Sequence, residues 1–261
     1  MALLTDGNPN DTEALRVYET AILDLAHVET IDLDAKLGLA TEEISQEVLD
    51  ILLGHTPLSY APAYDYQGSI RRRLGVSDVV VTPQIKRWHA LRSLEVIYRD
   101  AYNNQLNDRY RAKWDEYREL SRGAKVRAIT FGIGLVSKPL PKALGPVIGV
   151  TAGPILATTY YVRIGWVSAA GQEGSPSTVT TYQTVDGSLL MVGTTNPPAG
   201  AAGWNAYIGL TDLTLALQNS TPLALGQTFQ LPATGLVPGR VPGDGQAPDI
   251  YVTGGWTLQR G

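Results

Sequence analysis

Apolar residues recur every three or four positions through the first part of the chain, and this period predicts helices. The stretch "NDTEALRVYETAILDLAHV" begins with a candidate N-cap among residues 10–12. Its apolar stripe consists of Leu15, Tyr18, Ile22, Leu25 and Val28. A shorter helix is predicted over "TEEISQEVLDILLG", with Thr41 as its cap and Gly54 as its end.

The longest predicted element is a single central helix that begins at Thr82 as a cap and Pro83 as its first residue. No further proline or glycine occurs before Gly123, so about 40 residues would form a helix of about 60 Å, with a kink near Asn103 and Asn104. Its stripe is rich in tyrosine, which suits half-buried faces. Two interpretations are open, the core of a helical bundle and an interface between subunits.

Beyond Gly123 the pattern changes. Residues 126–131 alternate as in a strand, and Gly132 and Gly134 suit a bend or a hairpin. The segment "KPLPKALGP" is a linker by composition, which places a domain boundary near residues 138–154. Short apolar runs then follow at a spacing typical of a β-sandwich. In "YYVRIGWV" the predicted core face consists of Tyr160, Val162, Ile164 and Trp166, and "AAGQEG" is predicted to be a solvent-exposed turn.

The end of the chain is rich in proline and glycine and resembles an extended arm. Its apolar tip would dock either on the sandwich of its own chain or on a partner. The docking residues would be Ile250, Tyr251, Val252, Trp256, Leu258 and Arg260. The predicted fold is therefore multidomain α and β: a helical bundle with one long central helix over residues 1–145, an all-β sandwich like those of immunoglobulin and fibronectin domains over residues 146–240, and a C-terminal arm over residues 241–261.

Charge is distributed unevenly along the chain. Residues 1–65 have a net charge of −11, residues 66–145 of +9 and residues 146–261 of −2. A basic cluster comprises Arg71, Arg72, Arg73, Lys86 and Arg87. The basic middle segment, which includes this cluster, would either complement the acidic first segment, within one chain or between copies, or make non-specific contact with nucleic acid. No motif that reads the grooves of DNA is present.

Residues that could carry chemistry are scarce. The chain has no cysteine, and its three histidines, His27, His55 and His89, do not have the spacing of metal ligands. No nucleophile elbow, phosphate-binding loop or dinucleotide-binding fingerprint occurs. We therefore expect no enzyme activity and no cofactor. We also expect no secretory signal, because the N-terminus lacks a basic region and a long apolar core. We expect no membrane span, because no apolar run reaches about 18 residues.

Two segments resemble known domains. The segment "TYYVRIGWVSAAGQEGSPS" is similar to a strand and turn of fibronectin type III and related immunoglobulin-like domains, and "NPPAGAAGWNAYIGLT" is similar to another of their strands. The order of the two segments differs from that of an ordinary fibronectin module. The stretch "LQNSTPLALGQTFQLPATGLVPG" is similar to segments attached to such sandwiches in structural proteins of tailed bacteriophages.

The combination of a helical N-terminal domain and a long helix resembles the head-to-tail connector adaptors of tailed phages. This resemblance implies a homo-oligomeric ring, typically of twelve copies, located in the virion beneath the portal. It implies a C-terminal extension that docks on the portal protein, contact with tail or stopper proteins, and non-specific contact with packaged DNA at the lumen. The basic cluster would face either the DNA or a neighbouring subunit.

Two other classes of function compete with this interpretation. The first is a tail or baseplate component whose sandwich binds a host-surface glycan, with Trp204, Tyr207 and Trp256 stacking on sugars. The second is a small enzyme with a scattered site, such as a peptidoglycan hydrolase.

Overall fold

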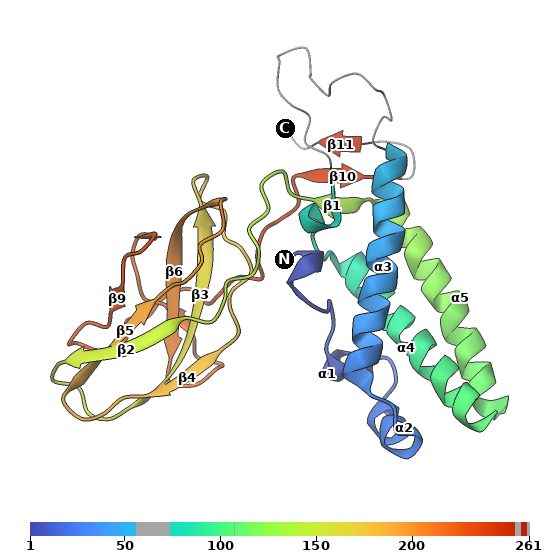
Figure 1. The fold of residues 1–261 in the computed structure, drawn as a ribbon, viewed down its shortest axis with the longest axis horizontal. Coiled ribbons are helices and arrows are strands. Elements are labelled where there is room, and N and C mark those ends of the chain that lie inside the picture. Colours follow the sequence, from blue (N-terminus) through green and yellow to red (C-terminus); the bar gives the residue numbers. More distant parts are fainter. Residues whose placement is uncertain (56–73, 107, 254–256, 260–261) are drawn as a thin grey trace, which may run out of the picture. The chain divides into compact units, whose positions relative to one another are not determined.

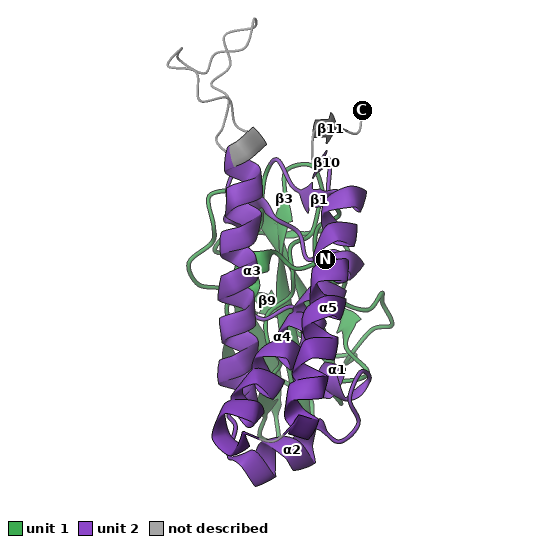
Figure 2. Ribbon diagram, turned by 90° about the vertical axis from the view of Figure 1, so that its right-hand side faces the viewer, with its two compact units in different colours: residues 1–6, 138–247 green, residues 7–137, 248–261 purple. Residues whose placement is uncertain are grey.

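The computed structural model describes residues 1–55, 74–106, 108–253 and 257–259, and its elements form two compact units (Figure 1). The helical unit comprises residues 7–137 and 248–261, and the sandwich unit comprises residues 1–6 and 138–247 (Figure 2). The chain is therefore mixed α and β, with helices packed together in its N-terminal part and antiparallel sheets in its C-terminal part.

Three long helices dominate the helical unit, and two short ones precede them. The helices are α1 (Thr12–Arg16), α2 (Ile22–Glu29), α3 (Leu33–His55), α4 (Pro83–Gln105) and α5 (Asp108–Phe131), with a 3-10 turn at Val76–Asp78. Helix α4 packs against both α5 and α3. The first apolar stripe belongs to two helices, because the chain turns between residues 17 and 21. Its members Leu15 and Ile22 are buried, whereas Tyr18 and Val28 are exposed.

The predicted single central helix is two helices that fold back on each other. Helix α4 begins as predicted, with the Thr82 side chain accepting a hydrogen bond from the Ile85 amide at 3.4 Å and Pro83 in the first turn. It ends at Leu106, whose φ of 50° is left-handed and stops the helix. The prediction of one rod about 60 Å long is therefore wrong, and the chain reverses two residues beyond the predicted kink.

The aromatic stripe explains why the sequence pattern did not reveal this turn. The rings of Tyr98 and Tyr117 stack with centroids 5.4 Å apart, and those of Tyr102 and Trp114 with centroids 6.0 Å apart. Both helices turn their apolar residues to the same interface, so the period continues in phase across the reversal. The core interpretation of the stripe is confirmed for Tyr98 and Tyr117, which are buried.

Two further boundaries differ from the predictions. Residues 126–131 are the last turns of α5 and not a strand, and the Thr130 hydroxyl donates to the Val126 carbonyl as in a helix. Helix α3 begins at Leu33, where the Asp32 carboxylate accepts from the Ala35 amide at 3.1 Å. Thr41 is therefore not a cap, because it lies inside α3 and donates to the Leu37 carbonyl.

The C-terminal segment completes a small sheet in the helical unit. Strand β10 (Ile250–Val252) lies between β1 (Ile133–Leu135) and β11 (Thr257–Gln259), and all pairs are antiparallel. The Asp249 carboxylate accepts from the amide and the hydroxyl of Ser137. Residues 250–252 are thus a central strand and not a free arm, and the unit they join is the helical one, not the sandwich that we considered.

The sandwich unit consists of two antiparallel sheets. One sheet has the order β2-β5-β9, and the other has the order β4-β3-β6-β7 with β8 also paired to β6. The strands are β2 (Val147–Ala152), β3 (Thr159–Ser168), β4 (Thr180–Gln183), β5 (Ser188–Gly193), β6 (Ala201–Gly209), β7 (Ala216–Leu217), β8 (Leu223–Ala224) and β9 (Phe229–Gln230). A 3-10 turn at Leu4–Asp6 belongs to this unit, and Asp6 accepts a hydrogen bond from the Lys142 amide at 2.7 Å.

The core of the sandwich contains the predicted face of the first long strand. Tyr160, Val162, Ile164 and Trp166 are all buried, as predicted, and they pack with Trp204 of β6 and with side chains of the facing sheet. Alternation along an antiparallel strand places such residues on one face, and this pattern could be recognised without knowledge of the partner strands.

Candidate interaction surface

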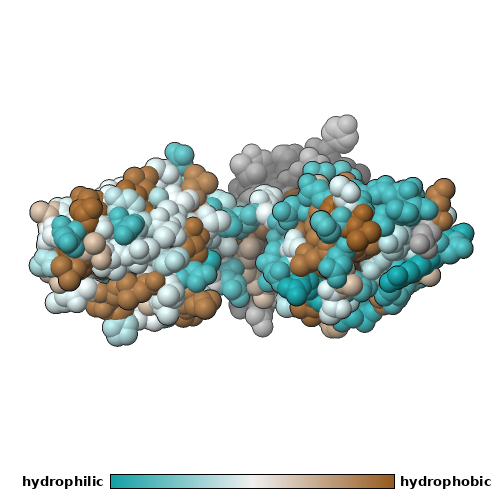
Figure 3. Space-filling view, turned by 90° about the horizontal axis from the view of Figure 1, so that it is seen from below, coloured by the Kyte–Doolittle hydropathy of each residue, from teal (hydrophilic) through white to brown (hydrophobic). Residues whose placement is uncertain are grey.

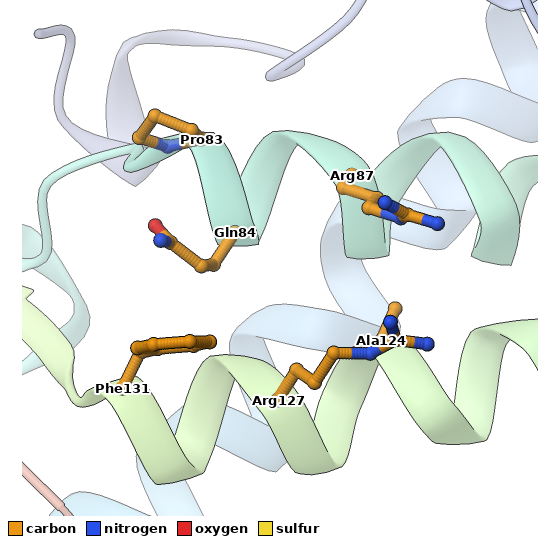
Figure 4. A pocket seen from close by; sticks show the side chains of 6 residues that line it. All are labelled: Pro83, Gln84, Arg87, Ala124, Arg127 and Phe131. Carbon is orange, nitrogen blue, oxygen red and sulfur yellow. The ribbon is translucent and has the colours of Figure 1, made fainter.

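A groove opens on the helical unit where the first turns of α4 lie beside the last turns of α5 (Figure 4). It has a volume of about 230 Å³ and is lined by Pro83, Gln84, Arg87, Ala124, Arg127 and Phe131. The reversal at Leu106 creates it, because an antiparallel hairpin brings the start of one helix to the end of the other. Gly132, with a φ of 99°, ends α5 just beyond the groove.

The groove combines apolar side chains with two arginines. Phe131 is 65% exposed, and Leu120 lies about three turns earlier on the same side of α5 and is 37% exposed. The Arg127 Nε donates to the Gly123 carbonyl at 3.2 Å. Neither Arg87 nor Arg127 forms an ion pair with any residue that the structure describes. The arrangement can therefore hold a partner that offers both an apolar side chain and carboxylates or phosphates.

The structure places only part of the predicted basic cluster. Lys86 and Arg87 are exposed in the first turns of α4, whereas Arg71, Arg72 and Arg73 lie outside the described residues. Arg127 beside Arg87 was missed as a member of the site. The continued helical period beyond Gly123 is the signal that could have placed it on α5.

Four ion pairs among the described residues join charged side chains of the second segment to opposite charges of the first. Arg92 contacts Glu43 at 2.5 Å and also Glu95 of its own helix. Burial opposes the charged form of Arg92, but the carboxylates of Glu95 and Glu43 outweigh it and raise the arginine's pKa. Similar pairs between the two segments are Lys36–Asp100, Lys113–Glu19 and Lys125–Glu47. These pairs show charge complementarity between the two segments within one chain. None of them involves the basic cluster, whose contacts stay a prediction.

A tyrosine and carboxylate cluster holds the α1–α2 segment against the hairpin. The Tyr117 hydroxyl donates to Glu19 and the Tyr110 hydroxyl donates to the buried Glu29, both at 2.9 Å. Burial alone would raise the pKa of Glu19, yet the hydrogen bonds from Tyr117 and Lys113 lower it overall. These acidic residues therefore have a structural role.

His89 also has a structural role in this geometry. Its Nδ1 lies 3.0 Å from the Asn10 amide nitrogen, and its Nε2 lies 3.1 Å from the Leu37 carbonyl and 2.9 Å from the Thr41 hydroxyl. Burial lowers the pKa of His89 to about 4, so the ring is neutral and joins the N-terminal segment, α3 and α4. No cluster of three or more potential metal ligands occurs among the described residues.

Only some of the residues predicted to dock on the portal have side chains that the structure describes. Val252 is buried in the small sheet, and Ile250 and Tyr251 are half-buried. Leu258 pairs with Tyr251 across the hairpin, while its side chain, together with Trp256 and Arg260, lies outside the described residues. Docking of this segment on a portal stays a prediction.

Two of the three aromatic residues suggested for glycan stacking are not on the surface. Trp204 and Tyr207 are fully buried in the sandwich, and Trp256 lies outside the described residues. The Tyr207 hydroxyl donates to Glu173 at 2.6 Å, and Glu173 also pairs with Arg240. The predicted exposed turn is thus exposed only over residues 169–172, because the Glu173 side chain turns inward.

The sandwich surface is poor in charge and carries scattered apolar side chains. In Figure 3 brown apolar atoms on this unit lie among pale ones, whereas the helical unit shows more teal. The most exposed apolar side chain is Leu213, at 87%. Others are Leu156, Val185, Val147 and Leu210. Within the parts of the chain that are described, none of the helices is both long and apolar enough to cross a membrane.

Comparison with known proteins adds no relative to this description. Neither a family model, nor a curated protein, nor a solved structure matches the chain.

Proposed function

We propose that this chain is a structural protein of a tailed-phage virion, an adaptor that forms a ring between the capsid portal and the tail. The observation that carries this proposal is the groove between α4 and α5, an exposed apolar surface flanked by Arg87 and Arg127 on a packed helical hairpin. A surface of this kind on a packed scaffold suits association with another protein.

The division of the chain into two units supports an assembly protein. The helical unit has internal ion pairs that fix its helices, and the sandwich unit is a separate module with few charges. In the proposed particle the helical units form the ring. The sandwich contacts other components such as tail or stopper proteins.

The C-terminal hairpin is the proposed link to the portal. Strand β10 is held between β1 and β11, so this part of the chain is anchored in the small sheet of the helical unit. An anchored base reduces the conformational entropy lost when such a segment docks. Residues 253–261, including Trp256, Leu258 and Arg260, are the part that we propose meets the portal.

Co-expression of the full chain with the portal protein encoded by the same genome tests the function. We expect a complex with several copies of this chain per portal ring, measured by native mass spectrometry and seen as an added layer by electron microscopy. A bare portal beside a monomeric chain would contradict the proposal. The chain alone is not decisive, because adaptor assembly depends on its template by mass action.

A further inference from the structure

The groove faces away from α3. His89 of α4 contacts α3 through the Leu37 carbonyl, and Arg87 lies two positions earlier, about 200° around the helix. On α5, Lys125 pairs with Glu47 of α3 at 2.6 Å, and Arg127 lies two positions later. Both groove arginines therefore point to the side of the hairpin opposite to α3.

The outer face of α3 has the complementary character. The inner face of this helix consists of Ile44, Val48 and Leu52, all buried. Two positions from these lie Glu42 and Asp50, which are exposed and form no ion pair with any described residue. Leu49 lies beside them and is 36% exposed. The two carboxylates are about 12 Å apart along the helix axis.

We infer that the groove receives the outer face of α3 from a second copy of this chain, with Leu49 against Phe131 and with Glu42 and Asp50 against the two groove arginines. This inference rests on the proposed ring function and specifies its subunit interface. Opposite charges on the two surfaces favour this register. An apolar side chain on each surface supplies contact area that excludes water from the ion pairs.

The geometry also determines the kind of assembly. The two surfaces are different and lie on opposite sides of one unit, so each copy offers a groove to one neighbour and an α3 face to another. Such head-to-tail contacts form a closed ring when the rotation between copies closes. A phosphate backbone would satisfy the two arginines but would leave Phe131 and Leu120 without an apolar partner, which is why a protein surface is favoured over nucleic acid.

Two charge-reversal variants test the interface. One variant carries Arg87→Glu with Arg127→Glu, and the other carries Glu42→Arg with Asp50→Arg. Each should lose self-association, because its two surfaces then have the same sign of charge. An equimolar mixture should recover association. The acidic groove of the first variant fits the basic α3 face of the second, and the basic groove of the second fits the acidic α3 face of the first. All four changes in one chain should restore it as well.

Cross-linking makes even weak association measurable, because the chain has no cysteine. Gln46→Cys on the outer face of α3 and Gln84→Cys at the groove are introduced together, and a flexible bis-maleimide is added. We expect a ladder of multimers from this background. The ladder should fall at least about tenfold with either charge reversal and return in the mixture, which corresponds to about 1.4 kcal/mol or more.

A matched control changes charge away from both faces. Arg111→Glu with Arg122→Glu alters the net charge as much as the groove variant does, at two exposed positions of α5. It should leave the ladder intact. Circular dichroism of every variant confirms that the helices form. Loss of the ladder in this control as well, or no recovery in the mixture, would overturn the inference.

The remaining outcomes separate the interface from the function. If the ladder is absent yet copies still assemble on the portal, the inference is wrong and the adaptor function stands. If the ladder and its rescue appear but no portal is bound, the interface is correct and the adaptor function is wrong. If double-stranded DNA binds the wild-type groove and Arg87→Glu abolishes this without any ladder, nucleic acid is the ligand and the inference is also overturned.

Discussion

The helical unit carries 17 basic and 20 acidic side chains, whereas the sandwich unit carries four and five. In the helical unit, polar contacts such as Arg92–Glu43 and Tyr117–Glu19 determine how one helix lies against the next. In the sandwich, backbone ladders determine which strands are neighbours. One charged cluster, around Glu173, joins the turn after β3 to β6.

This difference indicates which interactions select one packing arrangement over others in each unit. Helices satisfy their own backbone hydrogen bonds, so only side chains distinguish one packing from another, and charged pairs are well suited to this. Strands bond to their neighbours through the backbone, and the sandwich therefore needs little charge to define its arrangement. The helical unit should consequently respond to salt and pH, and the sandwich to changes of core volume.

The largest effect is expected for Trp204→Ala in the sandwich core. Removing this fully buried side chain should lower the free energy of unfolding of the sandwich by about 4 kcal/mol. Hydrogen exchange measured on peptides should show faster exchange in β3 and β6 and little change in α4. The control is Leu213→Ala, an exposed position. Equal acceleration in both units would show that they do not unfold separately.

A second change tests whether the C-terminal strand β10 stabilises the helical unit or the sandwich. Val252→Ala removes a buried side chain from β10 and should lower the stability of the helical unit by about 2 kcal/mol. Exchange should accelerate in β1 and not in the sandwich. Val241→Ala, at an exposed site, is the control. If the stability and the hydrogen exchange of the helical unit do not change, β10 contributes little to that unit, and the segment is better described as a free arm.

The pH dependence of the helical unit should depend on His89. Its folded pKa of about 4 lies below the usual value of about 6.5, so the unfolded state binds the proton more readily between these values. The associated stability is complete above pH 6.5 and is lost as the pH falls towards 4. Between pH 7 and pH 5 the loss should be about 2 kcal/mol.

Urea unfolding followed by circular dichroism measures this loss, and His89→Gln is the comparison variant. The variant should be less stable at pH 7 but nearly insensitive to pH in this range. The sandwich has no histidine among its residues and should change little over the same interval. A pH dependence that persists in His89→Gln would assign it to other groups.

The smallest effect is expected from salt. Raising the ionic strength from about 0.05 M to about 0.5 M screens exposed pairs such as Arg122–Glu119. The helical unit should lose about 1 kcal/mol, and the sandwich less than half of that. Urea unfolding at each salt concentration, with hydrogen exchange to separate the units, provides the measurement. A larger loss in the sandwich would contradict the division of roles between the two units.

Some features could be predicted because they depend on neighbours in the sequence. The Thr82 cap with Pro83, an N-cap of α1 among residues 10–12 and the core face of β3 all follow from local hydrogen bonding or alternation. The structure confirms them, with Asp11 as the cap of α1. The reversal at Leu106 could not be predicted in this way. A leucine in a left-handed conformation is maintained by the aromatic contacts between α4 and α5, which are tertiary.

The candidate site was predicted only in part, for the same reason. Arg87 was recognised from its charge and its place in a basic segment, whereas Arg127 and Phe131 joined it only through the antiparallel hairpin. Trp204 and Tyr207 were proposed as exposed residues that stack on sugars, but Trp204 packs in the core of the sandwich and Tyr207 is buried against Glu173 and Arg240.

The sequence by itself determined the two classes of structure, the starts of α1 and α4 and the buried face of the longest strand, because period and capping act within a few residues. Only the tertiary structure decided that the central helix folds into a hairpin, that β10 joins the helical unit and that two arginines flank one groove. These depend on contacts between residues far apart in the chain, whose gain in buried area and hydrogen bonds exceeds the local preference to continue a helix or to remain extended.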